Sequence, residues 1–172
     1  MTQQPYHRQN LAAAIVQRAR QELEEAGGDR LSLRQIARFL EVTPAAVYRH
    51  YPDKAALLTQ LRRDIVEELT AALHAGVLDS ADATAMLQRM VTNLLAYAAA
   101  HPHAVAFIVV TPPPVPQSLQ TVVTLLAAQR QTVATPQTTT AMWTFLLGVL
   151  LQRDTTFDAT WISEQLLKLL AE

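Results

Sequence analysis

Residues 31–54 gather side chains that suit a polyanion. The run LSLRQIARFLEVTPAAVYRHYPDK carries three arginines, two tyrosines, one histidine and one lysine among apolar residues. Arginine forms paired hydrogen bonds with base edges, most often with those of guanine. The tips of tyrosine, histidine, lysine and threonine suit phosphate oxygens. The composition of this run therefore indicates a surface for nucleic acid, as long as these side chains point away from the protein core.

The candidate contacts lie close together in the chain. Thr43 stands where a helix is expected to begin, so its hydroxyl or backbone amide would meet a phosphate with the help of the helix dipole. Arg49 would reach a base edge, because the small Ala45 and Ala46 on the same side let the backbone approach a surface. The remaining candidates surround the same helix: Arg34, Tyr48, His50 and Lys54.

Two short helices must position these residues. Ser32 stands three residues before Gln35, which predicts a capping box at the start of the first helix. Thr43 and Pro44 predict the start of the second, which would run from Ala45 to His50. Two such helices joined by a tight turn form a helix-turn-helix.

The second helix is too short to be stable alone. We expect Val47 and Tyr51 to hold it against the first helix. The apolar side of that first helix consists of Leu33, Ile36, Ala37 and Leu40. The alternative is a plain helical hairpin whose arginines are solvated.

Apolar periodicity and helix stop signals predict an all-α protein of about nine helices. Residues 1–52 would form an N-terminal three-helix helix-turn-helix domain, residues 53–75 a connecting helix, and residues 76–172 a body of five further helices. The expected helices cover residues 10–26, 32–40, 45–50, 53–74, 79 or 82 to 101, 103–110, 118–131, 135–153 and 158–170. The sequence TPPPVP at residues 111–116 cannot be helical throughout and would form an extended connector.

The composition excludes several classes of protein. The chain of 172 residues contains no cysteine, which excludes disulfides, thiolate metal sites and thiol catalysis. Its longest apolar runs are far shorter than the roughly 20 residues that a membrane helix needs, and the polar N-terminus shows no secretory signal. A soluble cytoplasmic protein with no membrane partner is expected.

The net charge of −1 hides an asymmetry along the chain. Residues 1–63 contain ten Lys/Arg and six Asp/Glu, whereas residues 64–172 contain four and nine. A basic N-terminal third on an acidic body suggests that the basic part faces a polyanion. Chance clustering of charges is the alternative.

The run LSLRQIARFLEVTPAAVYRHYPDKAALL at residues 31–58 resembles the DNA-binding segment of the TetR/AcrR family of bacterial transcriptional regulators. The parts typical of that family occur in order: a leucine-serine start, an isoleucine-alanine pair, a valine-threonine turn, the sequence YRHY, and a lysine followed by a leucine pair. The resemblance covers about residues 8–65. The remainder of the chain matches the family in the count and order of its helices.

The resemblance implies a homodimer in which each subunit places residues 43–50 in the major groove of a double-stranded operator. The positions that match phosphate contacts are Thr43, Tyr48, His50 and Lys54. The positions that match base-facing residues are Arg34, Ala45 and Arg49. One position departs from the family pattern, because Glu41 stands where the turn usually holds glycine. If that residue is left-handed, its side chain costs on the order of 1 kcal/mol.

The resemblance also implies that residues 76–172 form a ligand-binding and dimerisation domain. The last two long helices carry apolar stripes suited to a four-helix dimer interface; the alternative is that these stripes are core. Gly148 lies within one of these helices, where it costs stability unless a close helix approach compensates. The interface candidates are Trp143, Leu147, Gly148, Leu151, Trp161, Ile162, Leu166 and Leu169.

A ligand pocket would lie among the fifth to eighth helices and would take a small apolar or aromatic molecule. Methionine and aromatic side chains line adaptable apolar cavities, although the same residues at helical spacing are also ordinary core. The lining candidates are Met86, Met90, Tyr97, Phe107 and Phe145. His101 and His103 are possible polar handles, and no metal site is expected from them without carboxylates or cysteines nearby.

No catalytic motif accompanies these features, so neither an enzyme nor a cofactor is expected. The expected function is that of a DNA-binding transcriptional regulator, a repressor released by its ligand. The first alternative is a constitutive or partner-controlled DNA-binding protein with a filled C-terminal core and no ligand. The second is a helical interaction module whose basic face meets an acidic partner.

Overall fold

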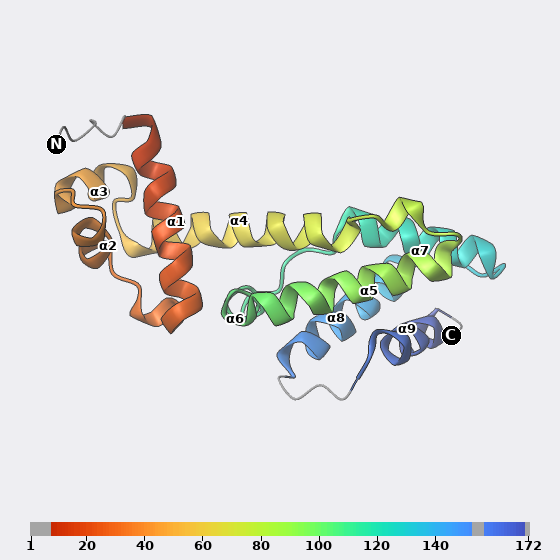
Figure 1. Cartoon of the computed structure of the whole chain (residues 1–172). Helices are drawn as coiled ribbons and strands as arrows, with labels where there is room; N and C mark the ends of the chain where they lie inside the picture. The colour runs from red at the N-terminus through yellow and green to blue at the C-terminus, as the bar shows by residue number, and fades with distance from the viewer. Residues whose placement is uncertain (1–7, 153–156, 171–172) are drawn as a thin grey trace. The chain divides into compact units, whose positions relative to one another are not determined.

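The structure, a computed structural model, describes residues 8–152 and 157–170. Over these residues the chain contains nine α-helices, two short 3-10 turns and no strand (Figure 1). The helices are α1 (Arg8–Ala26), α2 (Leu33–Phe39), α3 (Pro44–His50), α4 (Lys54–His74), α5 (Ala83–Ala100), α6 (Pro102–Val109), α7 (Gln117–Gln129), α8 (Pro136–Leu151) and α9 (Ala159–Leu169). The predicted all-α fold of about nine helices is therefore confirmed. The expected end of the eighth helix near Arg153 lies outside the described residues.

The chain divides into two compact units, Met1–Ile65 and Val66–Glu172. The division falls inside α4, the helix that the sequence analysis treats as a connector. No helix in the described part of the chain combines the length and the apolar character needed to span a bilayer.

The first unit is a three-helix arrangement in which α1 packs on α2 and α3, and α2 packs on α3. Its core is made of aliphatic side chains from every helix: Ile15, Ala19, Leu23, Leu31, Leu33, Ile36, Ala37, Val47, Leu57 and Leu61. Four of these, Leu33, Ile36, Ala37 and Val47, are residues that the sequence analysis expected to face inward. Burial of this set holds the short α2 and α3 in place.

Most predicted helix starts are capped by their own side chains. A backbone N–H three residues further on donates to the side-chain oxygen of Thr43, Asp53, Asp82, Thr135 and Asp158. The capping box predicted at Ser32 is wrong, because this residue occupies the N-cap position but its side chain accepts no capping hydrogen bond. The buried Leu31 and Leu33 on either side hold that helix start without it.

The turn after α2 forces one residue into the left-handed region. Glu41 has a φ of 55°. Its N–H donates to the Arg38 carbonyl at 3.2 Å, and the N–H of Val42 donates to the Ala37 carbonyl at 3.0 Å. These two bonds form a Schellman motif, which normally has glycine at this position. The predicted departure at Glu41 therefore carries a backbone cost.

The second unit is organised around α5, which packs against α6, α7 and α9, while α8 packs against α6, α7 and α9. The amide of Asn93 on α5 donates to the Ala75 carbonyl at 2.8 Å, just beyond the end of α4. The indole N–H of Trp143 on α8 donates to the Pro113 carbonyl at 2.9 Å, and this bond is buried. The proline-rich connector is thus tied to the core of the unit.

Replacing Glu41 with glycine should stabilise the protein. Glycine adopts this left-handed conformation without a side-chain penalty of about 1 kcal/mol, although the glycine chain is freer when unfolded. We expect the free energy of unfolding in urea to rise by up to about 1 kcal/mol.

The matched control is Glu41→Ala, which removes the same charge but keeps a Cβ. Its free energy of unfolding should stay within about 0.5 kcal/mol of the wild-type value. Equal stabilisation by both variants would mean that the charge, and not the backbone conformation, is responsible.

Candidate nucleic-acid interface

The short helix α3 turns one apolar residue inward and a polar side outward. Val47 is fully buried, and α3 packs on both α1 and α2. Ala45 and Arg49, one turn apart, lie on the side of the helix opposite to it and are exposed. The Arg49 Nε donates to the Ala45 carbonyl at 3.4 Å. This long hydrogen bond leaves the guanidinium able to turn toward a base edge.

Thr43 and His50 are exposed at the two ends of α3. The Thr43 Oγ1 accepts the N–H of Ala46 at 3.3 Å. Because the oxygen accepts in this bond, the hydroxyl proton remains available for a phosphate oxygen. Thr43 thus combines a capping role with a possible contact.

Arg34, Tyr48 and Lys54 line one shallow concavity of about 380 Å³. They come from α2, α3 and the first residue of α4, so three helices bring two cations and a phenol to one place. The Lys54 Nζ donates to the Asp29 carbonyl at 2.8 Å, which orients the ammonium group. The carboxylate of Asp53 also lines the concavity, but it accepts the Ala56 N–H at 2.7 Å. The geometry suits a phosphate group.

Three of the predicted DNA contacts line the concavity and four do not, a grouping that the sequence did not show. Arg34 was grouped with the base-facing positions, yet its side chain shares the concavity with two residues predicted to contact phosphate. The concavity does not include Thr43, Ala45, Arg49 or His50. Helix spacing alone carried no signal for this grouping, because the three lining residues come from different helices.

Tyr51 supports α3 from its C-terminal end. Its side chain is half-buried, and its backbone N–H donates to the Val47 carbonyl at 3.0 Å. Burial raises the pKa of its phenol above the ordinary value of 10.0, and the nearby carboxylate of Asp64 raises the pKa further. The phenol is therefore neutral at physiological pH.

The five ligand candidates of the second unit differ in burial. Met90 and Tyr97 are buried in the core, and the Tyr97 hydroxyl donates to the Glu68 carboxylate at 3.0 Å. Met86, Phe107 and Phe145 are half-buried.

A groove of about 680 Å³ instead lies along α5, α6 and the C-terminal end of α8, and none of the five candidates lines it. Its walls include Leu95, Ala98, Val105, Val149 and Leu150, with His103 and Gln152 as polar residues. Sequence reasoning missed this groove because alanine and aliphatic residues at helical spacing look like core. Of the residues that the sequence analysis considered for ligand binding, His103 lines this groove.

The dimer candidates separate into core and surface residues. Trp143, Leu147, Ile162 and Leu166 are buried by their own chain, which favours the alternative that this part of the stripes is core. Gly148, Leu151 and Trp161 are exposed, and Leu169 is half-buried. A Cβ at Gly148 would meet no atom within 4 Å, so no close helix approach within the described chain accounts for this glycine.

Comparisons with known proteins bear most directly on the first unit. Residues 15–61 match the family model described as bacterial regulatory proteins of the tetR family. A nucleoid occlusion factor SlmA from Marinomonas sp. (strain MWYL1) is 32% identical over 88 residues, which are 51% of this chain and 45% of the relative. The chain therefore spans about half the length of the curated relatives that it matches.

Solved structures match over nearly the whole chain. A protein of unknown function from Rhodococcus sp. RHA1 is 25% identical and has a TM-score of 0.76, with 99% of this chain and 100% of that chain covered. A TetR variant from Acinetobacter baumannii AYE, solved in complex with minocycline, is 20% identical and has a TM-score of 0.63, with 92% and 93% covered. The second likeness concerns the fold alone. Together, these matches show that residues 15–61 form the helix-turn-helix segment of the tetR family of bacterial regulatory proteins, and that nearly the whole chain shares the fold of these solved structures.

Proposed function

We propose that the protein is a DNA-binding transcriptional repressor that acts in the cytoplasm as a homodimer. Each subunit lays α3 in the major groove of an operator and leaves the DNA when a small apolar or aromatic ligand binds the second unit. The observation that carries the proposal is the concavity of the first unit, where Arg34, Tyr48 and Lys54 converge beside the outward face of α3. Convergent donors of this kind suit a duplex backbone, and an exposed arginine beside them suits base reading.

The contacts divide into two classes. Arg49, with the small Ala45 beside it, reads base edges. Arg34, Tyr48 and Lys54 bind the phosphate backbone, and Thr43 and His50 extend this contact at the two ends of α3. The excess of basic over acidic residues in the first 63 positions, ten against six, favours approach to DNA.

The groove of the second unit supports a ligand-responsive regulator over one with a filled core. Its volume of about 680 Å³ lies within the range typical of small-molecule sites. Its walls are mostly apolar, and among the described residues no carboxylate, lysine or arginine lines it, so a neutral apolar or aromatic ligand fits better than a highly charged one. A TetR structure solved in complex with minocycline is an example of this fold with a polycyclic ligand.

The exposed apolar residues of α8 and α9 support a homodimer. Leu151 is 58% exposed and Trp161 is 39% exposed. Exposed residues of this size are typical of subunit interfaces. We place the dimer contact on the surface formed by Gly148, Leu151, Trp161 and Leu169, where the glycine would allow a partner helix to approach closely.

Variants of the DNA contacts should separate base reading from phosphate binding. Arg49→Ala should reduce the preference for a selected duplex over random DNA, since it removes a base contact. Arg34→Ala and Lys54→Ala should weaken binding to both duplexes alike, and each should reduce the slope of log affinity against log salt by about 0.9. Fluorescence anisotropy with duplexes selected from random DNA, between about 50 and 200 mM salt, measures both effects.

The matched control is Arg63→Ala, which removes an exposed arginine of α4 that does not line the concavity. If all three contact variants behaved like this control, the DNA-binding proposal would fall. If Arg34→Ala changed base preference in the manner of Arg49→Ala, its assignment to the backbone would be wrong.

Filling the groove of the second unit should abolish ligand binding but leave DNA binding intact. Ala98→Phe places a ring in the groove, whereas Ala128→Phe adds the same ring at an exposed position of α7 outside it. We expect the fluorescence enhancement of 1-anilinonaphthalene-8-sulfonate and the release of operator by minocycline to be lost in the first variant only. Equal dye and drug responses in both variants would contradict a ligand site in this groove.

Charges on the α8–α9 surface should dissociate the dimer. Leu151→Glu combined with Trp161→Glu would bury unpaired carboxylates in the contact, so we expect monomers in sedimentation velocity at concentrations where the wild type is a dimer. Val133→Glu, at a residue 77% exposed in the turn before α8, is the control and should leave the dimer intact. Dimers of the double variant would place the interface elsewhere.

A further inference from the structure

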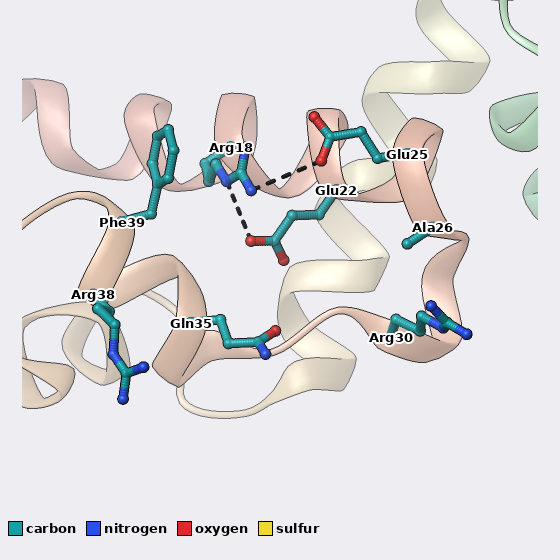
Figure 2. A pocket seen from close by; sticks show the side chains of 8 residues that line it. All are labelled: Arg18, Glu22, Glu25, Ala26, Arg30, Gln35, Arg38 and Phe39. Atoms are coloured by element: carbon teal, nitrogen blue, oxygen red, sulfur yellow. Dashed lines mark hydrogen bonds and ion pairs between the residues drawn. The ribbon is translucent and has the colours of Figure 1, made fainter.

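A groove of about 610 Å³ between α1 and α2 lies outside every contact assigned so far (Figure 2). It belongs wholly to the first unit, and its lining residues are Arg18, Glu22, Glu25, Ala26, Arg30, Gln35, Arg38 and Phe39. None of these residues lines the phosphate concavity. The groove is therefore a second surface of the helix-turn-helix unit.

The most unusual residue of the groove is Phe39, which is 59% exposed. It falls outside the apolar side of α2, so the core does not use it. Figure 2 shows its ring rising from α2 toward α1, and the Arg18 guanidinium carbon lies 3.9 Å from the ring centre. Exposed aromatic residues and arginines are enriched at protein interfaces.

On the α1 side of the groove, the side chain of Arg18 is held by ion pairs within its own helix. The Arg18 guanidinium pairs with the carboxylate of Glu22 at 3.2 Å and with that of Glu25 at 3.9 Å. These ion pairs and the cation–π contact hold the Phe39 ring in one orientation. A partner that stacks on this ring would not have to order it, which favours binding.

The two remaining cations of the groove, Arg30 and Arg38, are exposed to solvent. The guanidinium groups of Arg30 and Arg38 carry no hydrogen bond or ion pair to any described residue. In Figure 2 the side chain of Gln35 lies between them. The wall on α1 keeps a net charge of −1, because the single Arg18 engages the two carboxylates of Glu22 and Glu25. With Arg30 and Arg38 included, the residues that line the groove carry a net charge of +1. The groove thus offers two exposed cations, Arg38 next to Phe39 in the chain and Arg30 at the other end of the groove (Figure 2).

We propose that this groove docks an acidic peptide segment of a partner protein, with an apolar side chain against Phe39 and carboxylates on Arg30 and Arg38. Arginine pairs bidentately with carboxylate, which supplies the specificity that an apolar contact lacks. The docking surface does not depend on the operator contacts of α3. It gives the regulator a protein partner in addition to DNA.

The proposal is tested with fluorescein-labelled 12-residue peptides. One peptide carries a central phenylalanine between glutamates and aspartates, and its partner carries glutamine and asparagine in their place. Fluorescence anisotropy should show binding of the acidic peptide alone. Arg30→Ala combined with Arg38→Ala, and separately Phe39→Ala, should each weaken that binding by about tenfold or more, as expected for central interface residues.

The controls are Arg63→Ala and Leu78→Ala, which remove an exposed arginine and an exposed leucine away from the groove. Both should stay within twofold of the wild type, and circular dichroism should show that every variant is folded. Failure of the acidic peptide to bind, or equal binding by the groove variants and the controls, would overturn the proposal.

The same variants distinguish a docking surface from a DNA surface. Operator affinity of Arg30→Ala/Arg38→Ala should stay within twofold of the wild type. If it falls with a flatter salt slope while peptide binding is unchanged, the two arginines contact DNA and the docking proposal is wrong. If no variant binds operator but the peptide results hold, the proposed function fails and the docking surface stands.

Discussion

The burial of Val47 is the contact on which the candidate interface depends. Its helix, α3, has only seven residues, a length that does not support a stable isolated helix. The fully buried valine holds α3 against α1 and α2, the Thr43 cap begins it, and the Schellman turn at Glu41 sets its entry. Every outward side chain of α3 takes its direction from this packing. Burial of Val47 on one side of α3 thus determines which side of the helix is exposed.

The helix α2 serves two surfaces at once. Its inward side supplies Leu33, Ile36 and Ala37 to the core. Near its N-terminal end, Arg34 joins the phosphate concavity, and near its C-terminal end Phe39 faces the groove on α1. Because a helix places residues around its full circumference, a seven-residue element can contribute to the core, to the concavity proposed to bind phosphate and to the groove proposed for docking.

The second unit keeps its core and its groove separate. Large side chains such as Met90 and Trp143 are buried in the interior, and protein interiors are generally close-packed. The groove is lined by small and aliphatic residues of α5, α6 and α8. Small side chains such as Ala98 leave space between the helices. Separately, the buried hydrogen bond from Trp143 to the Pro113 carbonyl holds the proline-rich connector in place. Large side chains therefore lie in the core of this unit, whereas small and aliphatic side chains line the candidate ligand site.

The sequence alone determined the helices and most of their caps, because capping bonds join residues three apart and stop signals act locally. It also determined the apolar face of each helix and the family of the helix-turn-helix. Only the tertiary structure decided which helix covers each face. For that reason the sequence did not show that Arg34 shares a concavity with Tyr48 and Lys54, or that Trp143 and Ile162 are buried by their own chain. It also missed the groove lined by alanine and leucine. Periodicity reports which side of a helix is apolar, but the neighbour that buries it comes from a distant part of the chain.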